Sequence, residues 1–152
     1  MDKRVKKIIE ALNLEPLKME GGFFRETYRS GGCTSILYLI TINSFSRIHR
    51  LSSVEIYNFL SGDPVTMLNI NKDGKVHEVT LGNNFYNGEL LQHIVPPGSW
   101  QGALMKGEGN FALLGTVVSP GFEYSDYESC AKYKDRLLNS FPDYTELLLK
   151  LF

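Results

Sequence analysis

Residues 49–62 read His-Arg-Leu-Ser-Ser-Val-Glu-Ile-Tyr-Asn-Phe-Leu-Ser-Gly, and this stretch decides the fold. A histidine opens it, a glutamate follows six positions later, and a glycine lies seven beyond that. Side chains alternate between the two faces of a β-strand, so odd-numbered positions of a strand point the same way. His49, Leu51 and Glu55 can therefore face one interior. The stretch predicts polar groups on the inner wall of a β-structure.

A second stretch, Val95–Gln101 (VPPGSWQ), is expected to bring another strand to the same interior. Its Pro-Gly pair is typical of a tight turn, which would deliver Gln101 to the cavity that His49 and Glu55 face. Trp100 alternates with Gln101 and points to the opposite face. There we expect it to pack between sheets or at a dimer contact.

Other short runs of β-branched and aromatic residues surround these two stretches. They cover residues 34–43, 54–60, 64–70, 75–81, 89–95 and 110–119. Turn sequences such as Asp73-Gly74 and Asn87-Gly88 separate them. A parallel sheet would need crossover connections of a dozen or more residues, which the spacing does not provide. The pattern predicts an all-β protein built as an antiparallel sandwich or barrel.

Helical periodicity is confined to the two ends of the chain. Apolar residues at three- and four-residue steps predict an N-terminal helix within 1–13: Val5, Ile8, Ile9 and Leu12. Two short helices separated by Pro142 are expected within 126–152. With 152 residues, the chain is of ordinary size for one domain. We predict a single domain over 1–152, with the β-barrel over 20–122.

Composition excludes several classes of protein. Sixteen Lys and Arg against seventeen Asp and Glu give a net charge of -1, which disfavours nucleic-acid binding. No apolar run is long enough for a membrane span or a signal peptide. The two cysteines, Cys33 and Cys130, match no redox or zinc pattern and are expected to be reduced thiols. We therefore predict a cytoplasmic protein with no nucleic-acid or membrane partner.

Four segments occur in an order similar to that of the small single-domain cupins of the cupin-5 type. They are EGGFFRETYRS from Glu20, HRLSSVEIYNFLSGDP from His49, VPPGSWQ from Val95 and SPGFEYSDYE from Ser119. The similarity runs from about Leu14 to Glu128. It implies a double-stranded β-helix, or jelly-roll, barrel that forms a homodimer. The family it resembles is a domain of unknown function.

The resemblance also marks two positions where imidazoles are missing. A complete cupin site holds a transition metal with three histidines and one glutamate, whereas this chain has Leu51 and Gln101 at two of the histidine positions. Leucine has no donor atom, and an amide oxygen is a weak ligand for iron, nickel or copper. We expect no cofactor and no tightly held metal. At most, His49, Glu55 and Gln101 would hold a weakly bound divalent ion.

A His–Glu pair in a barrel lumen permits acid–base chemistry. If His49 and Glu55 hydrogen-bond, the carboxylate would orient the imidazole as a general acid or base. The plainer alternative is a structural pair left from a metal-binding ancestor. The family is also distantly similar to the nucleotide-sugar 3,5-epimerases, which use such a pair with a tyrosine. Tyr28, Tyr38 and Tyr57 all remain open as that tyrosine.

Further side chains complete the predicted site. Tyr57 shares the parity of Glu55 and would line an aromatic wall, and Arg25 would anchor a carboxylate or phosphate or else form a surface ion pair. The family pattern has more polar groups near this place than the chain, which carries Lys18, Met19, Val54 and Asn58 instead.

Three functions follow in order of preference. The first is binding of a small polar or sugar-like molecule in the barrel lumen without a catalytic metal. The second is an isomerase or epimerase that acts on a sugar or sugar nucleotide through His49 and Glu55. The third is a metal-dependent oxygenase or decarboxylase, which the two missing imidazoles disfavour. A binding protein and an enzyme both stay open.

Overall fold

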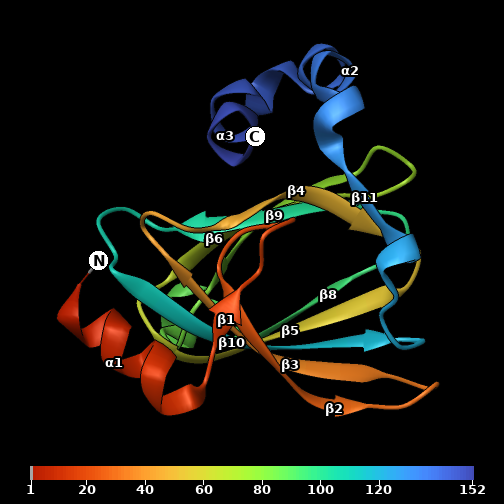
Figure 1. Ribbon diagram of the computed structural model, residues 1–152. Coiled ribbons are helices and arrows are strands. Elements are labelled where there is room, and N and C mark those ends of the chain that lie inside the picture. The colour runs from red at the N-terminus through yellow and green to blue at the C-terminus, as the bar shows by residue number, and fades with distance from the viewer. Residues whose placement is uncertain (1) are drawn as a thin grey trace.

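The computed structural model describes residues 2–152 and has two antiparallel sheets packed face to face (Figure 1). The first sheet has the spatial order β1-β2-β3-β10-β5-β8. Its strands are Glu15–Pro16 (β1), Phe23–Arg29 (β2), Thr34–Thr41 (β3), Val54–Gly62 (β5), Gln92–Val95 (β8) and Phe111–Ser119 (β10). Neighbours far apart in the chain, such as β3 and β10, show that the sheet is built by long connections and not by simple hairpins alone.

The second sheet has the order β11-β4-β9-β6-β7. Its strands are Ser46–Leu51 (β4), Val65–Ile70 (β6), Val76–Leu81 (β7), Trp100–Met105 (β9) and Tyr127–Ser129 (β11). Consecutive strands β4 and β5 lie in different sheets, and so do β5 and β6. This alternation between sheets is the jelly-roll arrangement that the sequence predicts.

The inner faces of the sheets form one apolar core, because alternate residues of each strand point inward. On β5, Glu55, Tyr57 and Phe59 are buried while their neighbours are partly exposed, as the predicted parity requires. The surrounding core consists of Tyr38, Ile40, Val65, Met67, Leu81, Val95, Ala103, Met105, Ala112 and Leu114. The polar groups described below lie at one end of this core.

Helices cover the two outer faces (Figure 1). Helix α1 (Lys3–Leu12) packs its apolar side on the first sheet, where Val5 meets Leu39 and Phe111. Helices α2 (Lys134–Ser140) and α3 (Thr145–Leu151) lie on the outer face of the second sheet. Trp100 belongs to that outer cluster, so it packs beneath the C-terminal helices. No helix within residues 2–152 has the length and apolarity needed to cross a bilayer.

Three boundaries differ from the sequence-based ones. Strand β1 begins at Glu15, before residue 20, because it pairs with β2. Strand β11 lies inside the segment 126–152, where helices alone were expected, because Tyr127–Ser129 pairs with β4. Strand β8 begins only at Gln92, because Leu90 pairs instead with Leu81 of the second sheet in an isolated bridge. The barrel wall therefore reaches further along the chain than 20–122.

Candidate functional site

Strand pairing brings three predicted residues together at one end of the core. His49 on β4 lies directly opposite Gln101 on β9, and both are at most 1% exposed. Glu55 reaches them from β5 of the other sheet. Gln101 Nε2 donates a hydrogen bond of 2.8 Å to Glu55 Oε2. The shared interior predicted for positions 49, 51 and 55 is present, although two strands in opposite sheets provide it and not one.

The carboxylate that contacts His49 is Glu20 and not Glu55. His49 Nε2 lies 3.4 Å from Glu20 Oε2, and Nδ1 lies 2.8 Å from the carbonyl oxygen of Arg47. A carbonyl only accepts, so Nδ1 carries a proton and Nε2 faces the carboxylate. No hydrogen bond or ion pair joins His49 to Glu55 within residues 2–152. The predicted His49–Glu55 hydrogen bond is therefore absent: Glu55 accepts a hydrogen bond from Gln101, and His49 faces Glu20.

A glycine bend places Glu20 at this position. Gly21 has φ +113°, and a Cβ atom there would overlap the carbonyl oxygen of Phe45. The chain can pass this close only without a side chain. The Ser46 hydroxyl donates to Glu20 Oε1, and the Tyr38 hydroxyl donates to the Gly21 carbonyl at 2.9 Å. These contacts fix the Glu20 carboxylate against the imidazole.

Burial dominates the electrostatics of the site. It raises the pKa of Glu55 to about 7, and the nearby Glu20 carboxylate acts in the same direction. Glu55 is consequently both proton donor and proton acceptor near neutral pH. Burial also raises the pKa of Tyr38 and Tyr57 well above the ordinary value, so both hydroxyls remain neutral.

A cavity of about 90 Å³ opens beside these groups. Glu20, Glu55 and Thr116 contribute polar atoms to its wall. The rest of the wall is largely apolar and aromatic: Leu17, Met19, Phe24, Ile36, Leu51, Val118, Phe122, Tyr124 and Tyr127. Within residues 2–152, Gln101 Oε1 and Thr116 Oγ1 are the buried side-chain polar atoms that lack a hydrogen-bond partner. Such atoms usually bind water or a ligand.

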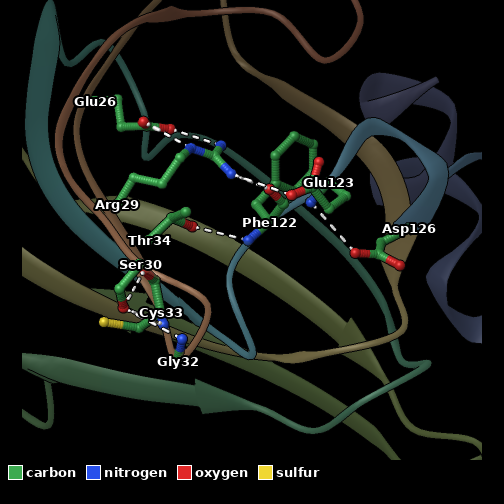
Figure 2. A network of polar contacts seen from close by, with 9 residues as sticks. All are labelled: Glu26, Arg29, Ser30, Gly32, Cys33, Thr34, Phe122, Glu123 and Asp126. Carbon is green, nitrogen blue, oxygen red and sulfur yellow. Dashed lines mark hydrogen bonds and ion pairs between the residues drawn. The ribbon is translucent and has the colours of Figure 1, made fainter.

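A charged network joins segments that line the outer part, or mouth, of the cavity (Figure 2). Arg29 donates two hydrogen bonds to Glu26, at 2.9 and 2.8 Å, and one of 2.9 Å to the carbonyl of Phe122. Its guanidinium also lies 3.4 Å from Glu123 Oε1. The Phe122 amide donates to Thr34 Oγ1 at 3.1 Å. Arg29 thus ties the segment that carries Phe122 to the hairpin of β2 and β3.

A β-bulge changes which residues of β2 reach the cavity. Arg25 alternates with Glu26, which lines the cavity, so Arg25 points to the outer face. The register between β2 and β3 shifts after Glu26, which places Tyr28 opposite Ser35 and leaves it 57% exposed. Arg29 takes the inward position instead. The structure therefore separates Arg25 and Tyr28 from the site for which they were predicted.

The remaining predicted tyrosines lie behind the cavity wall. Tyr38 and Tyr57 are each 1% exposed and belong to the core. The tyrosine that lines the cavity beside the histidine is Tyr127, whose ring stacks on His49 at 5.2 Å between centroids. Glu20, Tyr127 and Arg29 were not assigned a role from sequence. The only signal for these three residues was their place in two of the segments that carry the family resemblance.

The donors at the cavity do not fit a tightly held transition metal. Positions 51 and 101 provide no imidazole, and Glu20 and Gln101 already contact His49 and Glu55. Residues 2–152 contain no group of three or more His, Cys, Asp and Glu side chains arranged to hold a metal ion. Sites for such metals are usually built from imidazole, thiolate or carboxylate groups that converge on one point.

The fold and the end-of-barrel site define a cupin. Over residues 6–130 the chain matches the family described as Cupin superfamily (DUF985), and it belongs to that family. It is 29% identical over 134 residues to the uncharacterized protein YML079W of Saccharomyces cerevisiae, covering 71% of this chain and 66% of that protein. The chain thus spans just under two thirds of that relative's length.

Solved structures agree with this assignment. A hypothetical protein from Leishmania major superposes with a TM-score of 0.86 at 29% identity, over 96% of this chain and 97% of that one. Protein SO0799 from Shewanella oneidensis gives 0.85 at 33% identity, over 96% and 95%. Oxalate decarboxylase from Bacillus subtilis gives 0.61 at 15% identity, over 91% of this chain and 38% of that chain. This last likeness concerns the fold alone.

Proposed function

We propose that this cupin binds a small hydroxylated molecule, of the size and polarity of a sugar unit, in the cavity at Glu20, Glu55 and Thr116. The observation that carries the proposal is a group of buried polar atoms at the inner end of the cavity. Thr116 lies in the wall with Glu20 and Glu55, and Gln101, which is hydrogen-bonded to Glu55, has its Oε1 atom without a hydrogen-bond partner. An acceptor-rich wall favours a ligand that donates hydrogen bonds through hydroxyl groups. Aromatic rings beside it can pack on the apolar face of a sugar.

The charge and size of the cavity narrow the ligand class. The wall carries Glu20 and Glu55, so it disfavours anions close to the inner end. At about 90 Å³, the cavity admits the reactive end of a ligand and leaves the rest at the mouth. Arg29 at that mouth is available to a carboxylate or phosphate that displaces Glu26 or Glu123. A sugar bearing one anionic group fits both the acidic inner end of the cavity and Arg29 at its mouth.

An isomerase is the second candidate, and the position of Glu55 favours it. This carboxyl lines the cavity, and its pKa of about 7 allows it to give or take a proton at neutral pH. Glu20 and His49 form a second acid–base pair at the same wall. The catalytic pair would then be Glu55 with Glu20–His49, in place of the His49–Glu55 pair expected from sequence.

A thermal-shift screen with sugars, sugar phosphates and polyols tests the binding proposal. A ligand that binds only the folded state increases the free energy of unfolding, by about 2.7 kcal/mol at a ligand concentration of one hundred times Kd, and so raises the melting temperature. Thr116→Val and His49→Ala should each reduce the shift, and His77→Ala, a surface histidine outside the cavity, should leave it unchanged. A hit whose shift persists undiminished in both cavity variants contradicts the site. Parallel titration with manganese tests for the weakly bound divalent ion.

The same hits decide between binding and turnover. Each is incubated with the protein in deuterated water and examined by NMR for exchange of a carbon-bound proton. Exchange that disappears in Glu55→Gln supports the isomerase. A bound ligand that shows no exchange supports the binding protein.

The proposal includes the assembly and compartment expected from the sequence, a cytoplasmic homodimer. Large apolar side chains are exposed on strands β5 and β8 and the loop before β8: Leu60, Leu91 and Ile94. A second copy that covers them would remove an apolar patch from water. Sedimentation of the protein across a concentration series tests this, with a monomer at all concentrations as the contrary result.

A further inference from the structure

A second hollow lies on the opposite face of the second sheet, away from the cavity. Its volume is about 510 Å³. It is bounded by the loop after β6, the Pro-Gly turn before β9 and helix α2, the elements at the top of Figure 1. Its lining consists of Arg50, Ile70, Asn71, Lys72, Asp73, Gly74, Gly98, Trp100, Tyr133, Arg136, Leu137, Ser140 and Phe141. We call it the outer groove.

The floor of the outer groove is a planar cation held in place on two aromatic rings. The Arg50 guanidinium lies 4.5 Å from the Trp100 ring centroid and 5.2 Å from that of Tyr133. Arg50 Nε donates to Glu128 Oε2 at 2.6 Å, and the Tyr133 hydroxyl donates to Glu128 Oε1 at 2.7 Å. The Arg50 side chain is still 32% exposed. Part of this fixed planar side chain is therefore accessible to another planar group in the groove.

Two further cations in the outer groove have no acidic partner. Neither Lys72 nor Arg136 forms an ion pair within residues 2–152, in contrast to Arg50. Asp73, the acidic residue of the lining, accepts from the backbone amide of Lys75 in its own turn. Gly98 has φ +75°, and a Cβ atom there would overlap Lys72 Cε. The end of the Lys72 side chain thus lies against Gly98 in the lining of the groove.

We propose that the outer groove binds a small planar anion of the nucleoside monophosphate class. The base would stack on the Arg50 guanidinium, and the phosphate would contact Lys72 and Arg136. The inner end of the cavity carries two carboxyl groups, and its volume of about 90 Å³ leaves no room for a base, a ribose and a phosphate together. The groove therefore acts as a site separate from the cavity, and this inference does not depend on the proposed function.

The chain offers a built-in reporter for this site, because Trp100 is its single tryptophan. AMP is titrated into the protein while indole fluorescence is followed. A saturable change is expected, because a base stacked on Arg50 alters the surroundings of the indole ring. The double variant Lys72→Ala/Arg136→Ala should weaken the affinity at least about tenfold, the effect of losing one charge-assisted hydrogen bond. Lys3→Ala, a matched loss of one lysine on α1, should bind as the wild type.

Two further titrations isolate the parts of the ligand. Adenosine and inorganic phosphate should each bind more weakly than AMP, because each lacks one half of the contacts. Glu55→Gln should leave the AMP response unchanged, since it alters only the cavity. The inference is overturned by no saturable response to AMP, by inorganic phosphate that binds as tightly as AMP, or by an undiminished affinity in the double variant. A response that Glu55→Gln abolishes also overturns it, because it would place AMP in the cavity.

Discussion

Trp100 and Gln101 are neighbours in the chain, yet they belong to two sites with opposite physical character. Gln101 faces the barrel interior and donates to Glu55, a residue of the inner cavity whose pKa is raised by burial. Trp100 faces the outer groove, where the hydrogen bond from Arg50 holds the pKa of Glu128 below its ordinary value. Removal from water sets the pKa shift of the first carboxyl, and pairing with a cation sets that of the second. One strand thus separates an acidic, enclosed site from a basic, open one.

The largest expected effect contrasts the glycines that shape the two sites. In Gly21→Ala, the new Cβ meets the rigid backbone oxygen of Phe45 at a positive φ, and we expect a loss of about 3–4 kcal/mol. In Gly98→Ala, the Cβ meets the flexible end of Lys72, which can move, so the loss should be about 1 kcal/mol. Urea unfolding of both variants measures the difference. Equal losses would contradict the view that Glu20 depends on a backbone contact.

Glu55→Gln tests how far burial controls the cavity. Because the pKa of Glu55 is raised to about 7 on folding, the folded state binds the proton more tightly than the unfolded chain does. Stability therefore falls as the pH rises from about 4.5 to 7, by on the order of 3 kcal/mol. The glutamine variant lacks this fall, so its free energy of unfolding should exceed that of the wild type above pH 7 and match it near pH 4.

Urea unfolding from pH 4 to 8 gives the two stability curves. His77→Ala serves as the control, because that residue lies outside the cavity. If the wild-type and Glu55→Gln curves remain parallel over this range, the carboxyl is not held in the neutral form by burial.

Arg29→Met tests the network at the cavity mouth, and its effect should be local. Without the guanidinium, the carbonyl of Phe122 loses its donor and the segment loses its tie to Glu26. We expect hydrogen exchange at residues 120–126 to become a few-fold faster while global stability barely changes. Ligand association with the cavity should become faster as well. Unchanged exchange in this segment would show that Thr34 and the backbone hold it without Arg29.

The part of the site that was predictable from sequence is the part set by local alternation. Alternation within β4 and within β5, taken separately, is consistent with interior positions for His49 and Glu55, but the single strand assumed over 49–55 is absent. Gln101 lies on β9 just after the Pro-Gly turn, as its neighbours in sequence indicate. The partner of His49 depends instead on a bend that fits against Phe45, a residue distant in sequence. Arg29 lines the cavity in place of Tyr28 because of a bulge in β2, and the residues of β2 carry no clear signal for that bulge.

Glu128→Gln gives the smallest effect and completes the comparison of the two carboxyls. The pKa of Glu128 is lowered by the hydrogen bond from Arg50, so its contribution to stability is present above the unfolded pKa and is lost as the pH falls. The pair is partly exposed, at 32% for Arg50 and 43% for Glu128, so the loss at neutral pH should stay below about 1 kcal/mol. The contribution of Glu128 to stability therefore changes with pH in the opposite direction to that of Glu55. Urea unfolding at pH 3 and pH 7 should show a smaller difference between the variant and the wild type at the lower pH, because protonation of the wild-type carboxyl increases as the pH falls.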